Sequence, residues 1–312
     1  MNESPRLREL ASAGTVLVVQ AEFERPVRAL GLLERGRVAA LLTGAAGATG
    51  RSPIAVLALP GRGERLALRQ LRHGGFFGPL LGSAFLGAGR ARRELEVTAE
   101  LRARGAPVPR PVLAVASRIG GPFWRAALAT VFEESAQDAV AFLLAAPSRE
   151  QVVRACRAAG AAVRRFHDAG GHHPDLHVKN LLVRSGSTSP EIIVIDLDRA
   201  HVAAPPDPAE RMAELMRLLR SLLKRGLAAR VGSRGLASFL GGYTAGDRSL
   251  RRALLARLPL ERARLRLHAL GWNWRANSVT REPPPPDDAE TDGATRSTGP
   301  DLHGSSDPPP RS

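Results

Sequence analysis

The sequence predicts an α+β protein of two lobes: a mostly antiparallel N-terminal sheet with one helix, then a mostly helical C-terminal lobe. Apolar runs separated by glycine-rich turns dominate up to residue 132, and helical periodicity dominates after residue 135. A polar loop at 171–180, followed by two short apolar strands, interrupts the helices. We therefore predict an N-terminal extension over 1–35, a first lobe over 36–135 and a second lobe over 136–275.

The strands predicted for the first lobe are short and aliphatic. They cover residues 38–42, 54–59, 65–71, 112–116 and 126–132. A helix is predicted over 90–104, a segment rich in Arg, Glu, Leu and Ala. Gly105 and a proline-rich connector at 107–111 mark the end of this helix.

The second lobe is predicted from longer helical patterns. Helices are expected over 138–144, 150–169, 209–225 and 248–269, and strands over 181–184 and 192–195. Residues 281–312 contain Pro, Asp, Gly, Ser and Thr with almost no large apolar residue, so we predict a disordered tail there.

The charge of the chain predicts an anionic partner. The 312 residues carry a net charge of +15, and the tail over 281–312 holds three arginines against seven acidic residues, so the remainder carries +19. A nucleotide, a nucleic acid, an anionic lipid and a lipopolysaccharide all fit such a surface. Aromatic residues make up only 4% of the chain, which disfavours base stacking and therefore a nucleic-acid partner.

Signals for secretion or membrane insertion are missing from the sequence. No apolar run reaches the roughly 18 residues that span a bilayer. Charged residues stand at positions 3, 6, 8 and 9, unlike a secretory signal, and the single cysteine, Cys156, excludes an intramolecular disulfide. We therefore expect a cytoplasmic protein.

The polar loop carries the residues that predict chemistry. His173, Asp175, Leu176 and Asn180 match the pattern H-x-D-L-x-x-x-N, and the strand over 192–195 is followed by acidic residues. This order resembles the protein-kinase-like fold and predicts phosphoryl transfer from ATP.

The residue types in this arrangement suit that chemistry. Asp175 can accept the proton of an acceptor hydroxyl, and Asn180 and Asp196 offer hard oxygen ligands for Mg²⁺. His177 and Lys179 can reach toward the transferring phosphate.

The first lobe is then expected to hold the ATP phosphates. No lysine precedes Lys179, so Arg69 on the predicted strand over 65–71 takes the place of the phosphate-binding lysine of protein kinases. Glu94 on the following helix is its expected partner. Gly44 and Gly47 are candidates for a loop that folds over the phosphates.

At these residues the chain resembles the lipopolysaccharide kinase family. The matching segments are Leu68-Arg69, Arg72-His73-Gly74-Gly75, Arg90 to Glu94, Gly105-Ala106-Pro107-Val108-Pro109 and Asp196-Leu197-Asp198-Arg199. The resemblance implies an ATP- and Mg²⁺-dependent kinase. The acceptor that it implies is a hydroxyl of 3-deoxy-D-manno-octulosonic acid (Kdo) in the lipopolysaccharide core, at the cytoplasmic face of the inner membrane.

Two alternatives stay open. His177, two residues after Asp175, is similar to the loop of aminoglycoside and choline phosphotransferases, which share the fold. The missing lysine also permits a pseudokinase or a binding protein. A protein substrate is disfavoured, because Pro174 replaces the arginine of H-R-D and no A-P-E motif follows Asp198.

Overall fold

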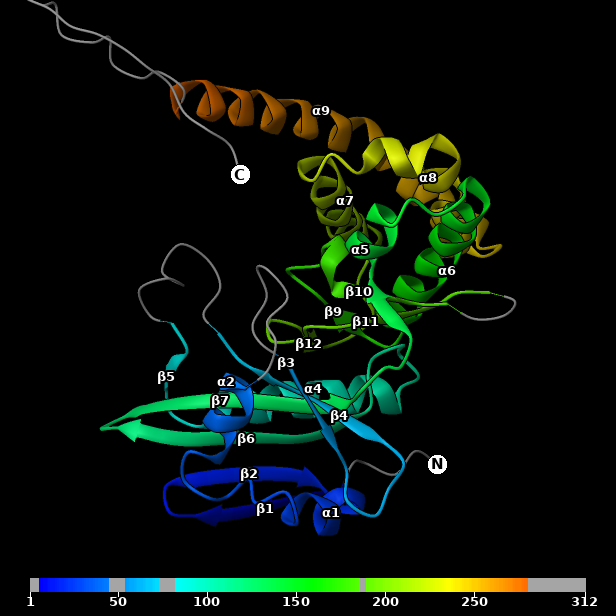
Figure 1. Ribbon diagram of the computed structural model, residues 1–312. Coiled ribbons are helices and arrows are strands. Elements are labelled where there is room, and N and C mark those ends of the chain that lie inside the picture. The colour runs from blue at the N-terminus through cyan, green and yellow to red at the C-terminus, as the bar shows by residue number, and fades with distance from the viewer. Residues whose placement is uncertain (1–5, 45–53, 73–81, 186–188, 280–312) are drawn as a thin grey trace, which may run out of the picture. The chain divides into compact units, whose positions relative to one another are not determined.

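The computed structural model describes residues 6–44, 54–72, 82–185 and 189–279 (Figure 1). Residues 1–265 form one compact unit, and residues 266–312 form a second that is described separately. The tail predicted over 281–312 and Gly47 lie outside the described residues. No helix in the described part of the chain has both the length and the apolarity needed to cross a membrane.

The N-terminal sheet is antiparallel, as predicted. Its strands are β1 (Leu7–Ser12), β2 (Thr15–Gln20), β3 (Ile54–Ala58), β4 (Arg65–Gln70), β5 (Ala84–Leu86), β6 (Pro111–Gly120) and β7 (Phe123–Val131). They lie in the order β1-β2-β6-β7-β4-β3, and β5 pairs with the start of β7. Because side chains alternate along β4, Arg69 points to the face opposite from Leu66 and Leu68.

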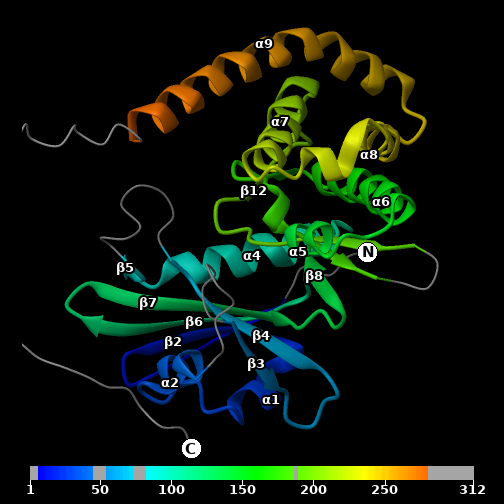
Figure 2. The same cartoon turned by 45° about the horizontal axis from the view of Figure 1, so that its top comes forward.

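Helices cover the two faces of this sheet differently. On one face, α4 (Gly89–Ala103) packs Ala91 and Leu95 against an apolar cluster that includes Leu128 (Figures 1 and 2). On the other face, η1 (Ala21–Phe23), α1 (Glu24–Arg28) and α2 (Arg37–Thr43) bury Phe23 and Leu42. We call the face covered by η1, α1 and α2 the outer face. The cleft of the candidate site lies on the opposite face, which α4 covers.

The rest of the compact unit is mostly helical. Its elements are β8 (Ala136–Asp138), α5 (Ala139–Leu144), α6 (Arg149–Asp168), β9 (Gly171–His172), η2 (Val178–Asn180), β10 (Leu181–Arg184), β11 (Glu191–Val194), β12 (His201–Val202), α7 (Pro208–Lys224), α8 (Ala228–Thr244) and the first half of α9 (Arg248–Val279). Two small sheets, β11-β10-β8 and β12-β9, hold the two ends of the polar loop.

Close packing of α6 on α8 depends on glycine. A Cβ atom on Gly160 would lie 2.0 Å from the carbonyl oxygen of Phe239, and one on Gly242 would lie 2.0 Å from that of Arg157. Only glycine permits backbones to approach this closely, so these two positions fix α8 against the helix that leads into the polar loop.

Two expectations from the sequence are wrong, and one helix was not predicted. Residues 38–42, predicted as a strand, lie in α2, because a short apolar run with two alanines suits a helix as well as a strand. Residues 7–20, placed in an extension, form strands β1 and β2 of the sheet. Helix α8 was not predicted, since its glycines obscure the helical pattern.

Candidate active site

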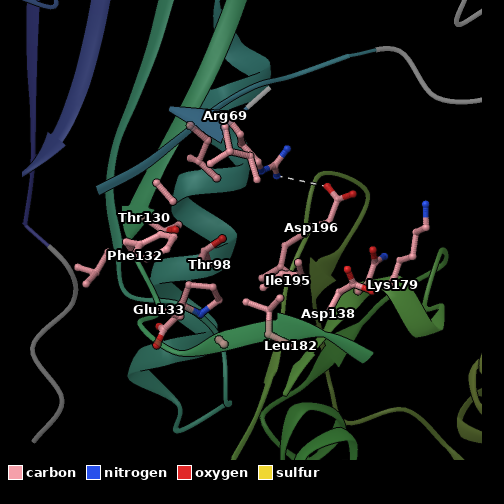
Figure 3. Close-up of a pocket in the computed structure, with 18 of the residues that line it drawn as sticks. Arg69, Thr98, Thr130, Phe132, Glu133, Asp138, Lys179, Leu182, Ile195 and Asp196 are labelled. Atoms are coloured by element: carbon pink, nitrogen blue, oxygen red, sulfur yellow. Dashed lines mark ion pairs between the residues drawn. The ribbon is translucent and has the colours of Figure 1, made fainter. Parts of the chain in front are cut away.

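A cleft of about 600 Å³ lies between the α4 side of the N-terminal sheet and the strands β8 and β10 (Figure 3). Its mostly apolar end is lined by Ala67, Leu128, Thr130, Val131, Phe132, Leu182 and Ile195, and the carboxylate of Glu133 lies beside Phe132 at this end (Figure 3). Its charged end is lined by Arg69, Glu94, Asp138, His177, Lys179, Asn180 and Asp196. A flat apolar end beside a charged end suits a nucleotide, which joins a planar base to an anionic triphosphate.

The charged end is built around Arg69. Its guanidinium forms an ion pair with Glu94 of α4 and lies 3.3 Å from the carboxylate of Asp196 (Figure 3). The Glu94 residue is only 2% exposed, and its Oε2 atom has no hydrogen-bond partner among the described residues. Burial raises the pKa of Glu94 to about 7, although Arg69 opposes the shift.

A second ion pair lies one helical turn away. Arg90 of α4 forms a bidentate pair with Asp198, in which its Nε donates to Oδ1 at 2.6 Å. The same guanidinium stacks on the ring of Phe85, with 4.5 Å between its carbon and the ring centroid. We call Arg90, Glu94, Asp196 and Asp198, together with Arg69, the interlobe cluster.

The polar loop is closed on itself by Asn180. The Asn180 Nδ2 atom donates to the backbone oxygen of Asp175 at 3.0 Å, and the Asn180 backbone oxygen accepts from the N–H of Ile195 at 2.8 Å. These bonds hold Asp175, Asn180 and the residue before Asp196 together. Asp196 adopts a left-handed backbone with φ of 65°, an uncommon conformation for a residue other than glycine, and strain of this kind is concentrated at functional sites.

A buried network beneath the loop fixes its start. Glu214 of α7 accepts hydrogen bonds from the backbone N–H of His173, at 3.0 Å, and from the His167 ring, at 3.2 Å. The other ring nitrogen of His167 lies 2.6 Å from the hydroxyl of Tyr243, which is 3.4 Å from Arg211. We call these five residues the loop-support cluster.

The pKa values in this cluster indicate a neutral histidine beside a carboxylate. Burial lowers the pKa of His167. Burial alone would raise the pKa of Glu214, but the hydrogen bonds from His167 and His173 lower it overall. The carboxylate of Glu214 therefore carries its charge next to the backbone that it orients.

Most of the predicted site residues meet in one place. Arg69, Glu94, His177, Lys179, Asn180 and Asp196 all line the cleft. Asp175 is exposed in the same loop and does not line it, and Gly44 ends α2 away from the lining residues. Glu214, His167 and Tyr243 were missed, since no local motif marks a buried acid in the middle of a helix.

The oxygen ligands in the cleft suit a magnesium ion. Asn180 and Asp196 offer an amide and a carboxylate oxygen, and the Asp196 side chain is 51% exposed toward the charged end. Mg²⁺ in nucleotide sites takes one or two protein ligands and completes its shell with phosphate and water oxygens. The residues present therefore fit this ion.

Comparison with known proteins agrees with this geometry. The family model described as lipopolysaccharide kinase (Kdo/WaaP) family matches residues 60–243, more than half of the chain. The chain belongs to this family. Membership makes it a phosphotransferase, and the resemblance drawn from the sequence motifs is confirmed.

Individual relatives support the assignment. The chain is 36% identical over 169 residues to a 3-deoxy-D-manno-octulosonic acid kinase of Photobacterium profundum, and 30% identical over 169 residues to one of Vibrio cholerae. Each match covers 52% of this chain and 68% of the relative. A solved structure, WaaP in complex with acyl carrier protein, covers 85% of this chain and 99% of its own with a TM-score of 0.51 and 19% identity. The predicted α+β kinase-like fold is therefore confirmed.

Proposed function

We propose that this lipopolysaccharide kinase family member uses ATP to phosphorylate a hydroxyl of Kdo in the lipopolysaccharide inner core. The observation that carries the proposal is the charged end of the cleft, where Arg69, Asn180 and Asp196 converge beside the Asp175 loop. The relatives from Vibrio cholerae and Photobacterium profundum are named as kinases of Kdo. An acidic sugar also suits a chain whose first 280 residues carry +19.

The transfer uses few protein groups. The acceptor oxygen forms a bond to the γ-phosphorus of ATP while the bond from that phosphorus to the β-phosphate oxygen breaks, and ADP leaves. The hydroxyl proton passes to the carboxylate of Asp175. Arg69 holds the phosphates in place of a lysine, and Glu94 holds Arg69.

The remaining cleft residues have supporting roles in this proposal. Asn180 and Asp196 would hold Mg²⁺, which neutralises phosphate charge when it is bound. Lys179 and His177 face the position of the transferred group and can stabilise its negative charge. Thr130, Leu182 and Ile195 line the apolar end, where the base would lie.

A second candidate is a phosphotransferase of the same fold that acts on an aminoglycoside or a choline-like acceptor. The observation that favours it is His177, which replaces the asparagine of the lipopolysaccharide kinases. Such acceptors are cationic, however, and the high positive charge of the chain would repel them. A pseudokinase is less well supported, because Arg69 and Glu94 already form the pair that a kinase needs.

The setting of the reaction follows from its acceptor. Kdo linked to lipid A lies in a membrane, so we propose that the protein works peripherally at the cytoplasmic face of the inner membrane. Attraction between its arginines and anionic lipid headgroups supports this setting.

The decisive test is a comparison of acceptors. Purified protein would be incubated with ATP, Mg²⁺ and, separately, a Kdo–lipid A precursor, an aminoglycoside and choline, and the products weighed by mass spectrometry. We expect one added phosphoryl group on the Kdo acceptor alone. Transfer to the aminoglycoside or choline instead would reject the Kdo assignment.

Two variants make the same test specific for the site. Asp175→Asn is expected to lower kcat by about 10²–10⁴-fold without a change in melting temperature, because an exposed general base contributes to rate and not to packing. Glu150→Gln, at an exposed carboxylate of α6 that pairs with Arg154, is the matched control. Turnover retained by Asp175→Asn would remove Asp175 as the base.

A further inference from the structure

A second hollow, of about 490 Å³, opens on the outer face of the N-terminal sheet near the β6–β7 turn. Its floor includes Thr15, which is 2% exposed and lies 3.2 Å from the hydroxyl of Ser117. Its rim carries the arginines Arg35, Arg72, Arg118 and Arg125, and within the described part of the chain no acidic residue lines it. Four guanidinium groups without an acid make this a site for an anion.

The arginines around the hollow are not neutralised by acids of the described chain. Eight other arginines of the lobe do form ion pairs with acids: Arg28, Arg62, Arg65, Arg69, Arg90, Arg92, Arg104 and Arg110. By contrast, Arg35, Arg72 and Arg125 have no ion-pair partner among the described residues, and Arg118 donates only to the backbone oxygen of Gly121. The charge around the hollow is therefore available to an external partner.

Exposed apolar side chains stand beside this charge. Leu86 is 78% exposed, Phe123 is 46% exposed and Ile119 is 45% exposed. Leu86 and Phe123 are cross-strand partners of β5 and β7, and Ile119 lies at the end of β6 close to the same turn. We call these three residues the apolar tip.

The apolar tip lies at the start of β7, whereas the residues of this strand that line the cleft, Leu128, Thr130 and Val131, lie toward its end. Strand β7 begins at the tip and ends at Val131, before the segment that joins the two lobes. Beside Leu86, Phe85 carries the guanidinium of Arg90, which reaches Asp198. Figure 2 places β5 beside the β6–β7 turn, away from β8. A partner bound at the tip would therefore contact the strand whose Phe85 carries the ion pair of Arg90 with Asp198.

We propose that the apolar tip and the arginines around the hollow dock the protein on an anionic lipid surface. Leu86, Ile119 and Phe123 enter the headgroup region, and Arg118 and Arg125 bind lipid phosphates. Exposed apolar side chains flanked by arginines are the combination that such an interface recognises. The inference deepens the proposed function and rests on it in one respect, namely that the acceptor is lipid-linked.

The first test measures binding to vesicles by sedimentation. Wild-type protein is expected to bind phosphatidylcholine vesicles that contain phosphatidylglycerol, to bind pure phosphatidylcholine weakly, and to dissociate at high salt. Arg118→Gln/Arg125→Gln should weaken binding about 30-fold, since each of the two arginines near such a surface contributes about 1 kcal/mol. The charge-matched control is Arg154→Gln/Arg157→Gln on α6, where both side chains are exposed.

The apolar tip is tested by Ile119→Ser/Phe123→Ser. Its control is Leu144→Ser, which is 58% exposed in the other lobe. Wild-type binding by the tip variant, or equal losses in the tip and control variants, would overturn the proposal. Circular dichroism melting would exclude unfolding as the cause of a loss.

A labelling experiment locates the contact directly. In a Cys156→Ser background, an environment-sensitive fluorophore on Ile119→Cys is expected to shift to the blue when anionic vesicles are added. The same label on Leu144→Cys should not shift. A shift at position 144 and none at position 119 would place the contact on the other lobe and reject the proposal.

Activity assays separate this inference from the proposed function. The tip variant should phosphorylate a detergent-dispersed Kdo acceptor at the wild-type rate and a vesicle-embedded acceptor more slowly. If the wild type phosphorylates neither acceptor, the Kdo assignment fails, whereas the vesicle-binding result still decides the docking surface. Equal rates of the tip variant and wild type on vesicles would count against docking at the tip.

Discussion

Two groups of charged residues flank the phosphoryl-transfer site, and they are built in opposite ways. The loop-support cluster is buried, and its carboxylate, Glu214, has partners on both sides. The interlobe cluster is partly open, and its most buried member, Glu94, has one carboxylate oxygen without a partner. The loop-support cluster can therefore keep one geometry, whereas the interlobe cluster can exchange partners.

The difference follows from where the partners lie in the chain. Glu214 joins α7 to the loop start and to His167 at the end of α6, all within one lobe. Arg69 and Arg90 instead join the N-terminal sheet and α4 to Asp196 and Asp198, which follow β11. The ion pairs of the interlobe cluster therefore join segments of both lobes, whereas the contacts of Glu214 stay within one lobe.

In the proposed reaction the two clusters have different tasks. A fixed loop would keep Asp175 and Asn180 in register for chemistry, because preorganised groups need no rearrangement in the transition state. A nucleotide that enters the cleft competes for Arg69, which is already shared between Glu94 and Asp196. Changes in the first cluster should therefore lower stability, and changes in the second should alter ATP binding.

The largest expected effect is on the loop-support cluster. Glu214→Ala would leave the His173 N–H and the His167 ring without their acceptor in a buried site, so the free energy of unfolding should fall by about 3 kcal/mol. Urea denaturation measures this loss. The control variant Glu150→Gln, at an exposed residue that pairs with Arg154, should change the free energy of unfolding by less than about 0.5 kcal/mol. A stability of Glu214→Ala equal to that of the control would contradict the fixed-loop interpretation.

The next effect concerns ATP. Arg69→Ala should raise KM for ATP about 30-fold, since a charge-assisted phosphate contact contributes roughly 2 kcal/mol, and it should also lower the melting temperature, because the buried Glu94 loses its ion-pair partner. Arg69→Lys should recover part of the affinity for ATP. Arg92→Ala, on the exposed side of α4, should leave KM for ATP unchanged. An unchanged KM in Arg69→Ala would move the phosphate contact to another residue.

A smaller effect is expected for the second interlobe pair. Arg90→Ala and Asp198→Asn should each lower kcat/KM about threefold to tenfold. Because they act through one ion pair, the double variant should be no worse than the single ones, with a coupling energy of about 1 kcal/mol. Additive losses would show that Arg90 and Asp198 act separately.

The sequence predicts the interlobe cluster better than the loop-support cluster. Arg69, Glu94, Asn180 and Asp196 each stand at a fixed distance from a local pattern, such as a strand end or the H-x-D loop, so spacing is enough to find them. Glu214 meets His173 across 41 residues, and no local pattern marks such a contact. The partner of Asp198 was also missed, although Arg90 was part of a recognised motif.

The fold shows the same limit. Strand β10 agrees with the prediction to the residue, and α6 agrees to within one residue, because strong periodicity and turns mark their ends. Helix α2 was mistaken for a strand, since a run of five apolar residues has no distinguishing period. Strands β1 and β2 were overlooked as part of the sheet because their partner, β6, lies about a hundred residues later.

The smallest expected effect is on pH dependence, and it separates the two clusters by sign. Burial raises the pKa of Glu94 to about 7, with Asp196 and Asp198 adding to the rise and Arg69 opposing it. A raised pKa in the folded state means that the folded protein holds the extra proton between the unfolded pKa, about 4.5, and 7. The contribution of Glu94 to stability is therefore full below about 4.5 and is lost as the pH rises through 7.

The contribution of Glu214 to stability depends on pH in the opposite direction. Its pKa is lowered in the folded state, so its contribution is present above its unfolded value and is lost as the pH falls. Glu94→Gln should therefore flatten the decline in unfolding free energy between about pH 4.5 and 7, measured by urea denaturation at several pH values, and Glu214→Gln should not. KM for ATP should also rise below pH 7 in the wild type, because a protonated Glu94 no longer holds Arg69 by charge, and should stay flat in Glu94→Gln. If both variants kept the wild-type pH profile, Glu94 would not be the titrating group of the interlobe cluster.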